Sequence, residues 1–163
     1  MPTSLPALIV IDMQKCMADP EVGARNNPGA ERNIAALLAA WRARQGLVVH
    51  VRHISRSPDS PFRPGQPGAE FQEQFAPRAD GHVVEKNVTD CFIHSSLERW
   101  LRVRGVEEVV IVGVSTNSSV EASARTAGSL RSRVQIVTMR VTPAASARAM
   151  ICGRSPAKSG KSR

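Results

Sequence analysis

Residues 111–125 read Ile-Val-Gly-Val-Ser-Thr-Asn-Ser-Ser-Val-Glu-Ala-Ser-Ala-Arg. This stretch, together with the patterns on either side of it, indicates the fold class. It starts as the end of a β-branched apolar run, turns through Gly113 and a polar cluster, and continues into alanine-rich sequence typical of a helix. A strand, a tight turn and a helix start predict an α/β unit with its turn at the carboxyl end of the sheet. Free N–H groups at a helix start can stabilise a developing anion, so Ser119 is a candidate site residue. Helix capping is the alternative explanation for these serines.

Strand and helix patterns alternate along the rest of the chain. Apolar runs predict strands at 5–11, 47–51, 82–85, 109–112 and 134–137, and amphipathic patterns predict helices at 31–44, 92–104 and 118–130. In the second helix the spacing places Ile93, Leu97, Trp100 and Leu101 on the inward face. This alternation predicts a mostly parallel sheet with right-handed crossovers.

A segment rich in proline and glycine, residues 55–80, separates the second and third predicted strands. A connection of this length in a compact domain is usually functional or disordered. Because it contains Phe62, Phe71 and Phe75, we expect it to pack against the body of the domain and to cover a site.

Composition and charge limit the classes of protein that fit. A chain of 163 residues with 42% hydrophobic content suits one globular domain. Residues 1–130 have no net charge, and the excess of +8 lies entirely beyond residue 130. We predict a domain at 1–137 followed by an atypical basic segment at 138–163. That segment is the sole support for a nucleic-acid or anion-binding alternative, and it has no aromatic residue to stack on a base. With no membrane span, no secretory signal and three widely spaced cysteines, we expect a cytoplasmic protein that binds neither membrane nor nucleic acid.

Polar side chains follow three of the predicted strands. Asp12 comes directly after the first strand, Lys86 directly after the third, and Ser119 lies in the turn after the fourth. Because the carboxyl ends of parallel strands meet at one crevice, we expect these side chains to converge. A carboxylate, an ammonium and a hydroxyl form a plausible base, stabiliser and nucleophile. Taken singly, Asp12 could instead cap a turn, and Lys86 could be a solvated surface lysine.

Three motifs resemble the isochorismatase-like cysteine hydrolases: Leu-Ile-Val-Ile-Asp-Met-Gln at 8–14, Val-Val-Glu-Lys at 83–86 followed by Cys-Phe at 91–92, and the stretch at 113–125. The resemblance covers residues 5–137. It implies a three-layer α/β/α, Rossmann-like domain with a mostly parallel, doubly wound sheet of six strands. It also implies a cis peptide bond between Val114 and Ser115, and assembly as a homodimer or larger homo-oligomer.

The resemblance also implies a mechanism on a small-molecule substrate, without a cofactor. The nucleophile at position 119 attacks a carbonyl or imine carbon, Asp12 takes and returns the proton, and Lys86 makes the nucleophile easier to ionise. Backbone N–H groups near Ser115 and Ser119 hold the oxyanion. Substrates of the family are small amides, ureas, nitrile-like compounds and the enol ether isochorismate, which is cleaved without a cysteine.

Further residues near the predicted strand ends are candidates for substrate contact: Gln14, Arg52, His53 and Phe92. The metal-dependent nicotinamidase branch has an Asp-x-His pattern after the second strand, whereas this chain has His-Val-Arg-His at 50–53. We therefore predict no metal site.

Position 119 departs from the family pattern, because the amidase-type members have cysteine there. A serine hydroxyl is much harder to ionise than a thiol. Three explanations stay open: an engineered inactive variant, a natural subgroup that uses serine or no covalent step, and a degenerate enzyme. We favour the natural subgroup.

The segment 138–163 is a second departure, since family members continue there with further helices and a strand. It reads as disorder, or as the product of a one-base frameshift near codon 138, which the coding DNA would decide. We predict a hydrolase acting on a small amide, urea-type or enol-ether substrate. A catalytically inactive or truncated family member is the first alternative, and a basic-tailed anion or nucleic-acid binder is the second.

Overall fold

The computed structural model describes residues 5–20, 27–130 and 132–136. Within these ranges one parallel sheet has the order β3-β2-β1-β4-β5, formed by β1 (Ala7–Ile11), β2 (Val48–His53), β3 (His82–Lys86), β4 (Glu108–Gly113) and β5 (Arg133–Ile136). The chain builds outward from β1 to β3 on one side and through β4 to β5 on the other. The order therefore reverses between β1 and β4, and ligands of such sheets bind outside the carboxyl ends of the strands at this point.

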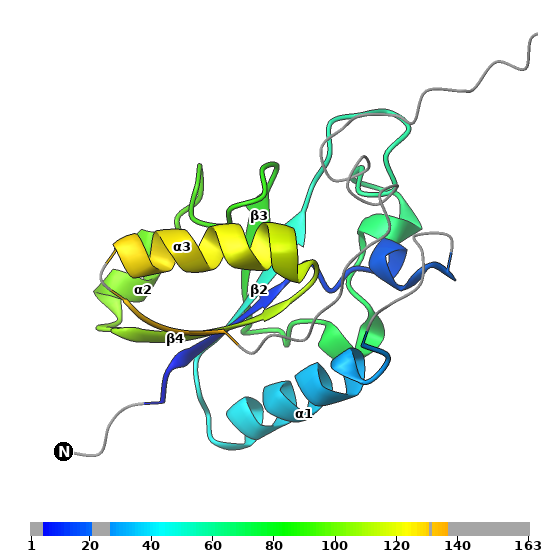
Figure 1. Cartoon of the computed structure of the whole chain (residues 1–163). Coiled ribbons are helices and arrows are strands. Elements are labelled where there is room, and N and C mark those ends of the chain that lie inside the picture. The colour runs from blue at the N-terminus through cyan, green and yellow to red at the C-terminus, as the bar shows by residue number, and fades with distance from the viewer. Residues whose placement is uncertain (1–4, 21–26, 131, 137–163) are drawn as a thin grey trace, which may run out of the picture.

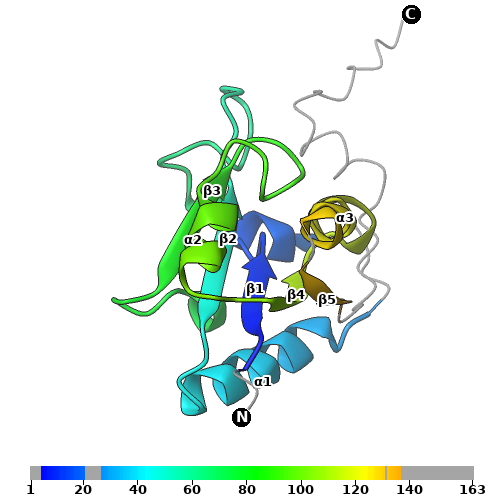
Figure 2. The ribbon, with the colours of Figure 1, turned by 90° about the vertical axis from the view of Figure 1, so that its left-hand side faces the viewer.

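Helices cover both faces of the sheet. The helix α1 (Ala30–Ala43) lies on one face, and α2 (Leu97–Val103) and α3 (Glu121–Ser129) lie on the other (Figure 1; Figure 2). Two apolar clusters fill the two interfaces, one including Ile34 and Leu38 of α1, the other Leu97 of α2. Because the central strands are buried on both sides, their sequences are apolar almost throughout. The predicted three-layer α/β/α architecture is confirmed, and the described residues form five of the six strands that the family resemblance implies.

The second predicted helix starts later than its apolar pattern suggests. Residues 92–96 form turns, α2 begins at Leu97, and Ile93 is 43% exposed rather than inward. Local side-chain hydrogen bonds account for the difference. The N–H of Phe92 donates to Oδ1 of Asp90 (2.9 Å), and Ser95 Oγ donates to the carbonyl oxygen of Cys91 (2.6 Å). Such bonds give the backbone an alternative to the helical ladder.

The helix after β4 also starts later than predicted. Residues Thr116–Val120 form a π-helical turn, and α3 proper begins at Glu121. The N–H groups of Ser118 and Val120 both donate to the carbonyl oxygen of Ser115, at 3.2 and 3.3 Å. π-Helical turns are rare and are frequent at functional sites, so the turn that carries Ser119 is distinct from an ordinary helix start.

The long segment between β2 and β3 packs against the domain, as predicted. Phe62 and Phe75 are buried in the cluster beneath α1. The segment is also tied to the chain that leaves β1, because Lys15 N–H donates to the carbonyl oxygen of Glu70 and Gln72 N–H to that of Met13. The predicted strand at 134–137 is observed as β5 up to Ile136, and the basic segment lies outside the described residues. No helix in the described part of the chain is long and apolar enough to cross a membrane.

Candidate active site

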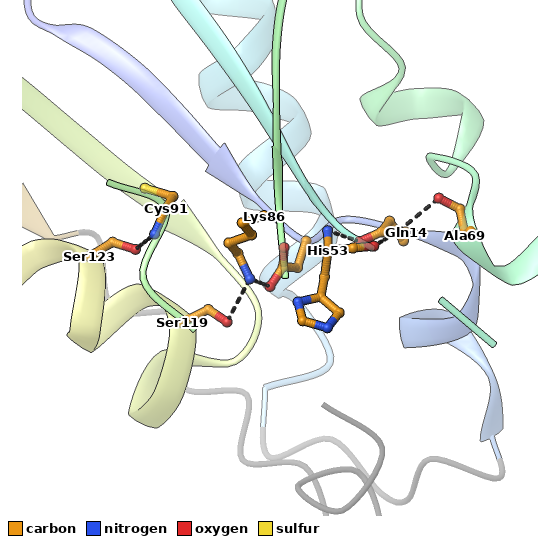
Figure 3. Close-up of polar contacts among 8 residues, drawn as sticks. Gln14, His53, Ala69, Lys86, Cys91, Ser119 and Ser123 are labelled. Atoms are coloured by element: carbon orange, nitrogen blue, oxygen red, sulfur yellow. Dashed lines mark hydrogen bonds and ion pairs between the residues drawn. The ribbon is translucent and has the colours of Figure 1, made fainter. Parts of the chain in front are cut away.

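The structure brings the three predicted polar residues together. Asp12 directly follows β1, Lys86 is the last residue of β3, and Ser119 lies in the turn after β4. Lys86 Nζ donates to Asp12 Oδ2 at 2.7 Å and to Ser119 Oγ at 3.2 Å. Figure 3 shows the ammonium group between Ser119 and the ring of His53. The lysine therefore links the carboxylate to the hydroxyl.

The length of lysine is needed for this contact. The strand β2 separates β3 from β1, and Lys86 pairs in register with His53 at the end of β2. Neighbouring strands are about 4.8 Å apart, so a group on β3 must cross β2 to reach Asp12. A flexible four-carbon side chain with a terminal ammonium spans this gap.

Both charged groups are removed from solvent. The side chain of Lys86 is 0% exposed and that of Asp12 is 3% exposed. Buried ions are tolerated only when they are paired and hydrogen-bonded. The two groups therefore form a buried ion pair next to the hydroxyl of Ser119.

Three buried side-chain atoms around this unit have no hydrogen-bond partner among the described residues: Asp12 Oδ1, Ser115 Oγ and His53 Nδ1. Native proteins leave few buried polar atoms unpaired, and each one costs about 1–3 kcal/mol. These three atoms belong to residues at or shortly after the carboxyl ends of β1, β2 and β4, so they are candidates to bind groups that a substrate would supply.

The backbone at this end of the sheet is unusual as well. Asp12 has φ 54°, a left-handed conformation that aspartate tolerates better than most residues. Gly113 has φ 137°, and a Cβ there would lie 2.1 Å from the carbonyl oxygen of Ile11, so only glycine fits where β4 meets β1. The Val114–Ser115 peptide bond is cis, in agreement with the expectation from the family resemblance.

His53 lies beside the charged pair. Burial and the Lys86 ammonium lower the pKa of His53 to about 4, against an opposing effect of Asp12. Its ring meets Phe62 edge-on with centroids 5.2 Å apart. The imidazole is therefore neutral at pH 7, and it can exchange hydrogen bonds with an uncharged group.

Gln14 is fully buried, and its carboxamide is engaged with the backbone. Nε2 donates to the carbonyl oxygens of His53 (2.9 Å) and Ala69 (2.8 Å), and Oε1 accepts from the His53 N–H (2.8 Å). Figure 3 shows these bonds on the opposite side of His53 from Lys86. The substrate contact predicted for Gln14 stays a prediction, and the observed contacts are with the protein itself.

The observed contacts of Arg52 and Phe92 are with other parts of the protein, so their predicted substrate contacts stay predictions. Arg52 forms an ion pair with Glu85 on the neighbouring strand at 2.5 Å, with its own side chain 28% exposed. Phe92 is partly buried against the cluster beneath α2 and α3. Next to it, burial raises the pKa of the Cys91 thiol to about 12, so this cysteine is not a thiolate nucleophile at physiological pH.

The sequence analysis did not predict two hydrogen bonds that connect α3, the helix after the Ser119 turn, to the segment after β3. Ser123 Oγ accepts from the N–H of Cys91 at 3.1 Å, and Thr126 Oγ1 donates to Asp90 Oδ2 at 2.5 Å. Both bonds join α3 to the segment after β3. An aspartate two residues before Phe92 is a turn signal that could have indicated part of this arrangement.

The described ranges contain no ligand cluster of the kind that a metal site requires. No group of three or more histidine, cysteine, aspartate or glutamate side chains there is placed to hold a metal ion.

Residues 6–138 match the Isochorismatase domain family. The chain is 36% identical to the isochorismatase family protein YrdC of Bacillus subtilis, over 76% of this chain and 66% of that protein. It is 31% identical to maleamate amidohydrolase of Pseudomonas putida, over 73% of this chain and 63% of that enzyme. The matches thus span less than two thirds of either relative.

A solved structure supports the same assignment. The structure of an isochorismatase-family protein from Chromobacterium violaceum is 40% identical, with a TM-score of 0.78, and the alignment covers 94% of this chain and 89% of that chain. The family match spans most of the sequence, and the fold agrees with it. The chain described here belongs to the isochorismatase family of hydrolases.

Proposed function

We propose that this protein hydrolyses a small amide at the cluster formed by Asp12, Lys86 and Ser119. The observation that carries the proposal is the buried Lys86 ammonium, which donates to the carboxylate and to the hydroxyl at once. A cation in this position stabilises negative charge on Ser119 Oγ as the oxygen attacks a carbonyl carbon.

Asp12 is the proposed general acid and base. One of its oxygens is occupied by Lys86, whereas Oδ1 is buried without a partner among the described residues. We assign to Oδ1 the proton that leaves Ser119 as the C–O bond forms. The protonated carboxyl then donates to the departing amine as the C–N bond breaks. Water hydrolyses the resulting ester, losing a proton to Asp12, which returns it to Ser119 Oγ.

Backbone and side-chain groups around the cluster complete the proposal. The N–H of Ser119 lies between those of Ser118 and Val120, which both donate to Ser115; with the N–H of Ser115 it is the proposed oxyanion site. The neutral imidazole of His53 is the proposed contact for the amide itself. Arg52 and Phe92 are proposed to contact the outer part of the substrate.

The proposal of an amide substrate is supported by the names of the relatives. Maleamate amidohydrolase is named for hydrolysis of an amide, and it shares 31% identity with this chain. Because the chain spans less than two thirds of that enzyme, the substrate is proposed only as a class: a small amide, or a urea with the same carbonyl chemistry.

Cleavage of an enol ether is the second candidate, and the serine at position 119 favours it. Serine is a weaker nucleophile than cysteine without a strong base. Asp12 with an unpartnered oxygen could instead protonate an enol ether, a reaction that needs no covalent step at Ser119.

A panel of small amides, ureas and isochorismate separates these candidates. With the wild type active on an amide, Asp12→Ala should lower kcat by about 10²–10⁴, the usual contribution of general acid–base catalysis. Ser119→Ala should abolish amide hydrolysis but spare enol-ether cleavage. Gln135→Ala, on the exposed edge of β5, serves as the control. Activity that survives Asp12→Ala would refute both mechanisms, and a wild type inactive on every substrate would favour the inactive-member alternative.

The expected assembly and location stay predictions. We propose a homodimer or larger homo-oligomer in the cytoplasm, and light scattering coupled to size exclusion tests the first. The alternative function as an anion or nucleic-acid binder depends on residues 138–163. Binding that weakens steeply with salt and is lost on removing that segment would support it.

A further inference from the structure

We infer that Gln14 is a positioning residue, which holds the imidazole of His53 against the Lys86–Asp12 pair and anchors residues 69–72 to the same point. This role rests on the proposed function, since it assigns to Gln14 the geometry of that site and not a contact with substrate. The assignment comes from the hydrogen bonds of one buried side chain.

The carboxamide of Gln14 uses its donor and acceptor groups on the backbone. It accepts from the His53 N–H and donates to the His53 carbonyl oxygen, so both backbone groups of one residue are bound by the same side chain. Its second donor bond goes to the carbonyl oxygen of Ala69. The partners also fix the orientation of the amide, because an N–H requires an acceptor and the two carbonyls require donors.

The position of these bonds explains what they do. His53 is the last residue of β2, beyond the part of the strand that pairs with β1, where the register ends at Val51. On the side facing β1, the backbone N–H and carbonyl of His53 therefore have no strand partner, and a side chain has to bond to them instead. Gln14, two residues after Asp12, supplies strand-like hydrogen bonds to His53 from the direction of β1.

The same residue joins the long segment to the site. Beyond the bond to Ala69, Gln14 forms an isolated antiparallel bridge with Phe71, and Gln72 Nε2 donates to the carbonyl oxygen of Gln14 at 3.3 Å. The chain after β1, the end of β2 and residues 69–72 therefore meet at Gln14, whose carboxamide holds His53 and Ala69 and whose backbone holds Phe71 and Gln72. Loss of this amide should release His53 and Ala69 from the side chain of Gln14, whereas the backbone hydrogen bonds between residues 70–72 and the chain after β1 stay in place.

The chemistry of His53 makes the consequence measurable. Its ring meets Phe62 edge-on and lies near the Lys86 ammonium and the Asp12 carboxylate, whose charges act on its pKa in opposite directions. Burial is the main reason that its pKa is lowered to about 4. A ring released from this place gains solvent and moves away from Lys86, and both changes raise its pKa toward about 6.5.

His50 provides an internal control on the same strand. It is also buried, and burial together with Arg42 lowers its pKa to about 4. Its ring meets that of Phe71 edge-on, with centroids 5.8 Å apart. Backbone hydrogen bonds that do not involve the carboxamide of Gln14 hold the residues on either side of Phe71. A general loosening of the domain would raise the pKa of both histidines, whereas loss of a positioning contact should raise that of His53 alone.

The test is a titration of the histidine ring signals by NMR in the full chain, between pH 3.5 and 8, for wild type and Gln14→Met. Methionine keeps the length of the side chain but has no amide. We expect the His53 midpoint to rise by about one to two pH units while the His50 midpoint is unchanged. Gln72→Met is the matched control, since it removes a neighbouring amide that does not contact His53, and it should leave both midpoints in place.

An unchanged His53 midpoint in folded Gln14→Met, or an equal rise of the His50 and His53 midpoints, would overturn the inference. If Gln14→Met does not fold, Gln14→Asn gives the same decision, because its shorter amide cannot hold both His53 and Ala69. The titration requires no substrate. A selective shift in a protein that hydrolyses nothing would therefore retain the positioning of His53 and reject the proposed function.

Discussion

The buried pair of Lys86 and Asp12 makes a sharp prediction about stability. Replacing Lys86 by methionine keeps an unbranched side chain of similar length but removes the charge, which leaves the Asp12 carboxylate in the interior without its cation. Both side chains are almost fully buried, at 0% and 3% exposure, so solvent screening does not reduce the effect. Removing one partner of such a pair costs about 3–5 kcal/mol.

That loss is large relative to the stability of a domain, which is about 5–15 kcal/mol in total. It corresponds to a fall in Tm of about 6–20 °C, given about 2–4 °C per kcal/mol for a domain of this size. Urea unfolding followed by circular dichroism measures it, with an unchanged slope against denaturant as the sign that the variant is still folded.

A double-mutant cycle separates the interaction energy of the Lys86–Asp12 pair from the cost of truncating either side chain alone. In Lys86→Met/Asp12→Asn the orphaned carboxylate is gone, and asparagine tolerates the left-handed backbone at position 12. We expect the double variant to be less destabilised than the sum of the single variants by at least about 2 kcal/mol. As a control, Arg125→Met breaks an exposed pair with Glu121, whose side chains are 77% and 49% exposed, and should change stability by less than about 0.5 kcal/mol.

A Lys86→Met variant that loses less than about 1 kcal/mol of unfolding free energy, together with additive effects in the cycle, would refute the buried ion pair. Such a result would mean that the ammonium and the carboxylate do not form a buried pair, and the site would lose the group that links Asp12 to Ser119.

Three further predictions concern the nucleophile, the strand junction and pH. Ser119→Cys should raise the kcat of amide hydrolysis at least about tenfold, since a thiolate beside an ammonium forms far more readily than an alkoxide; an equal or lower rate in steady-state assays speaks against covalent catalysis at this position. Gly113→Ala should lower the free energy of unfolding by at least about 3 kcal/mol or prevent folding, because the added Cβ would lie 2.1 Å from the backbone of β1. Gly128→Ala in α3 is the control: its added Cβ would meet no atom within 4 Å, and it should raise the free energy of unfolding by about 0.5–1 kcal/mol in thermal melts. Because burial lowers the pKa of both His50 and His53 to about 4, the unfolded chain binds their protons first as pH falls. Their contribution is therefore complete above about pH 6.5 and is lost toward pH 4, by about 2–3 kcal/mol for each histidine; urea midpoints that stay constant between pH 7 and 5 would contradict the burial of both rings.

Local patterns were sufficient for most of the fold. Continuous β-branched runs identify strands buried on both faces, and their alternation with amphipathic segments identifies the parallel sheet, because only helices on both sides can bury such strands. The patterns were less reliable at helix starts. Ile93 fits the apolar stripe of its helix, yet it is 43% exposed, because bonds from Asp90 and Ser95 hold the preceding residues in turns. Hydrophobic periodicity contains no information on such short-range competition.

For the site, sequence supplied the three residue types and their places at strand ends, since a parallel sheet brings those ends to one rim. Tertiary structure alone decided which atoms meet. That Lys86 reaches across β2 to Asp12, and that Gln14 bonds to the backbone of His53, depend on strand order and register between segments 39 to 74 residues apart. These contacts form when the whole sheet assembles and brings distant segments together, because most buried polar groups then need partners within the protein. No local pattern encodes them.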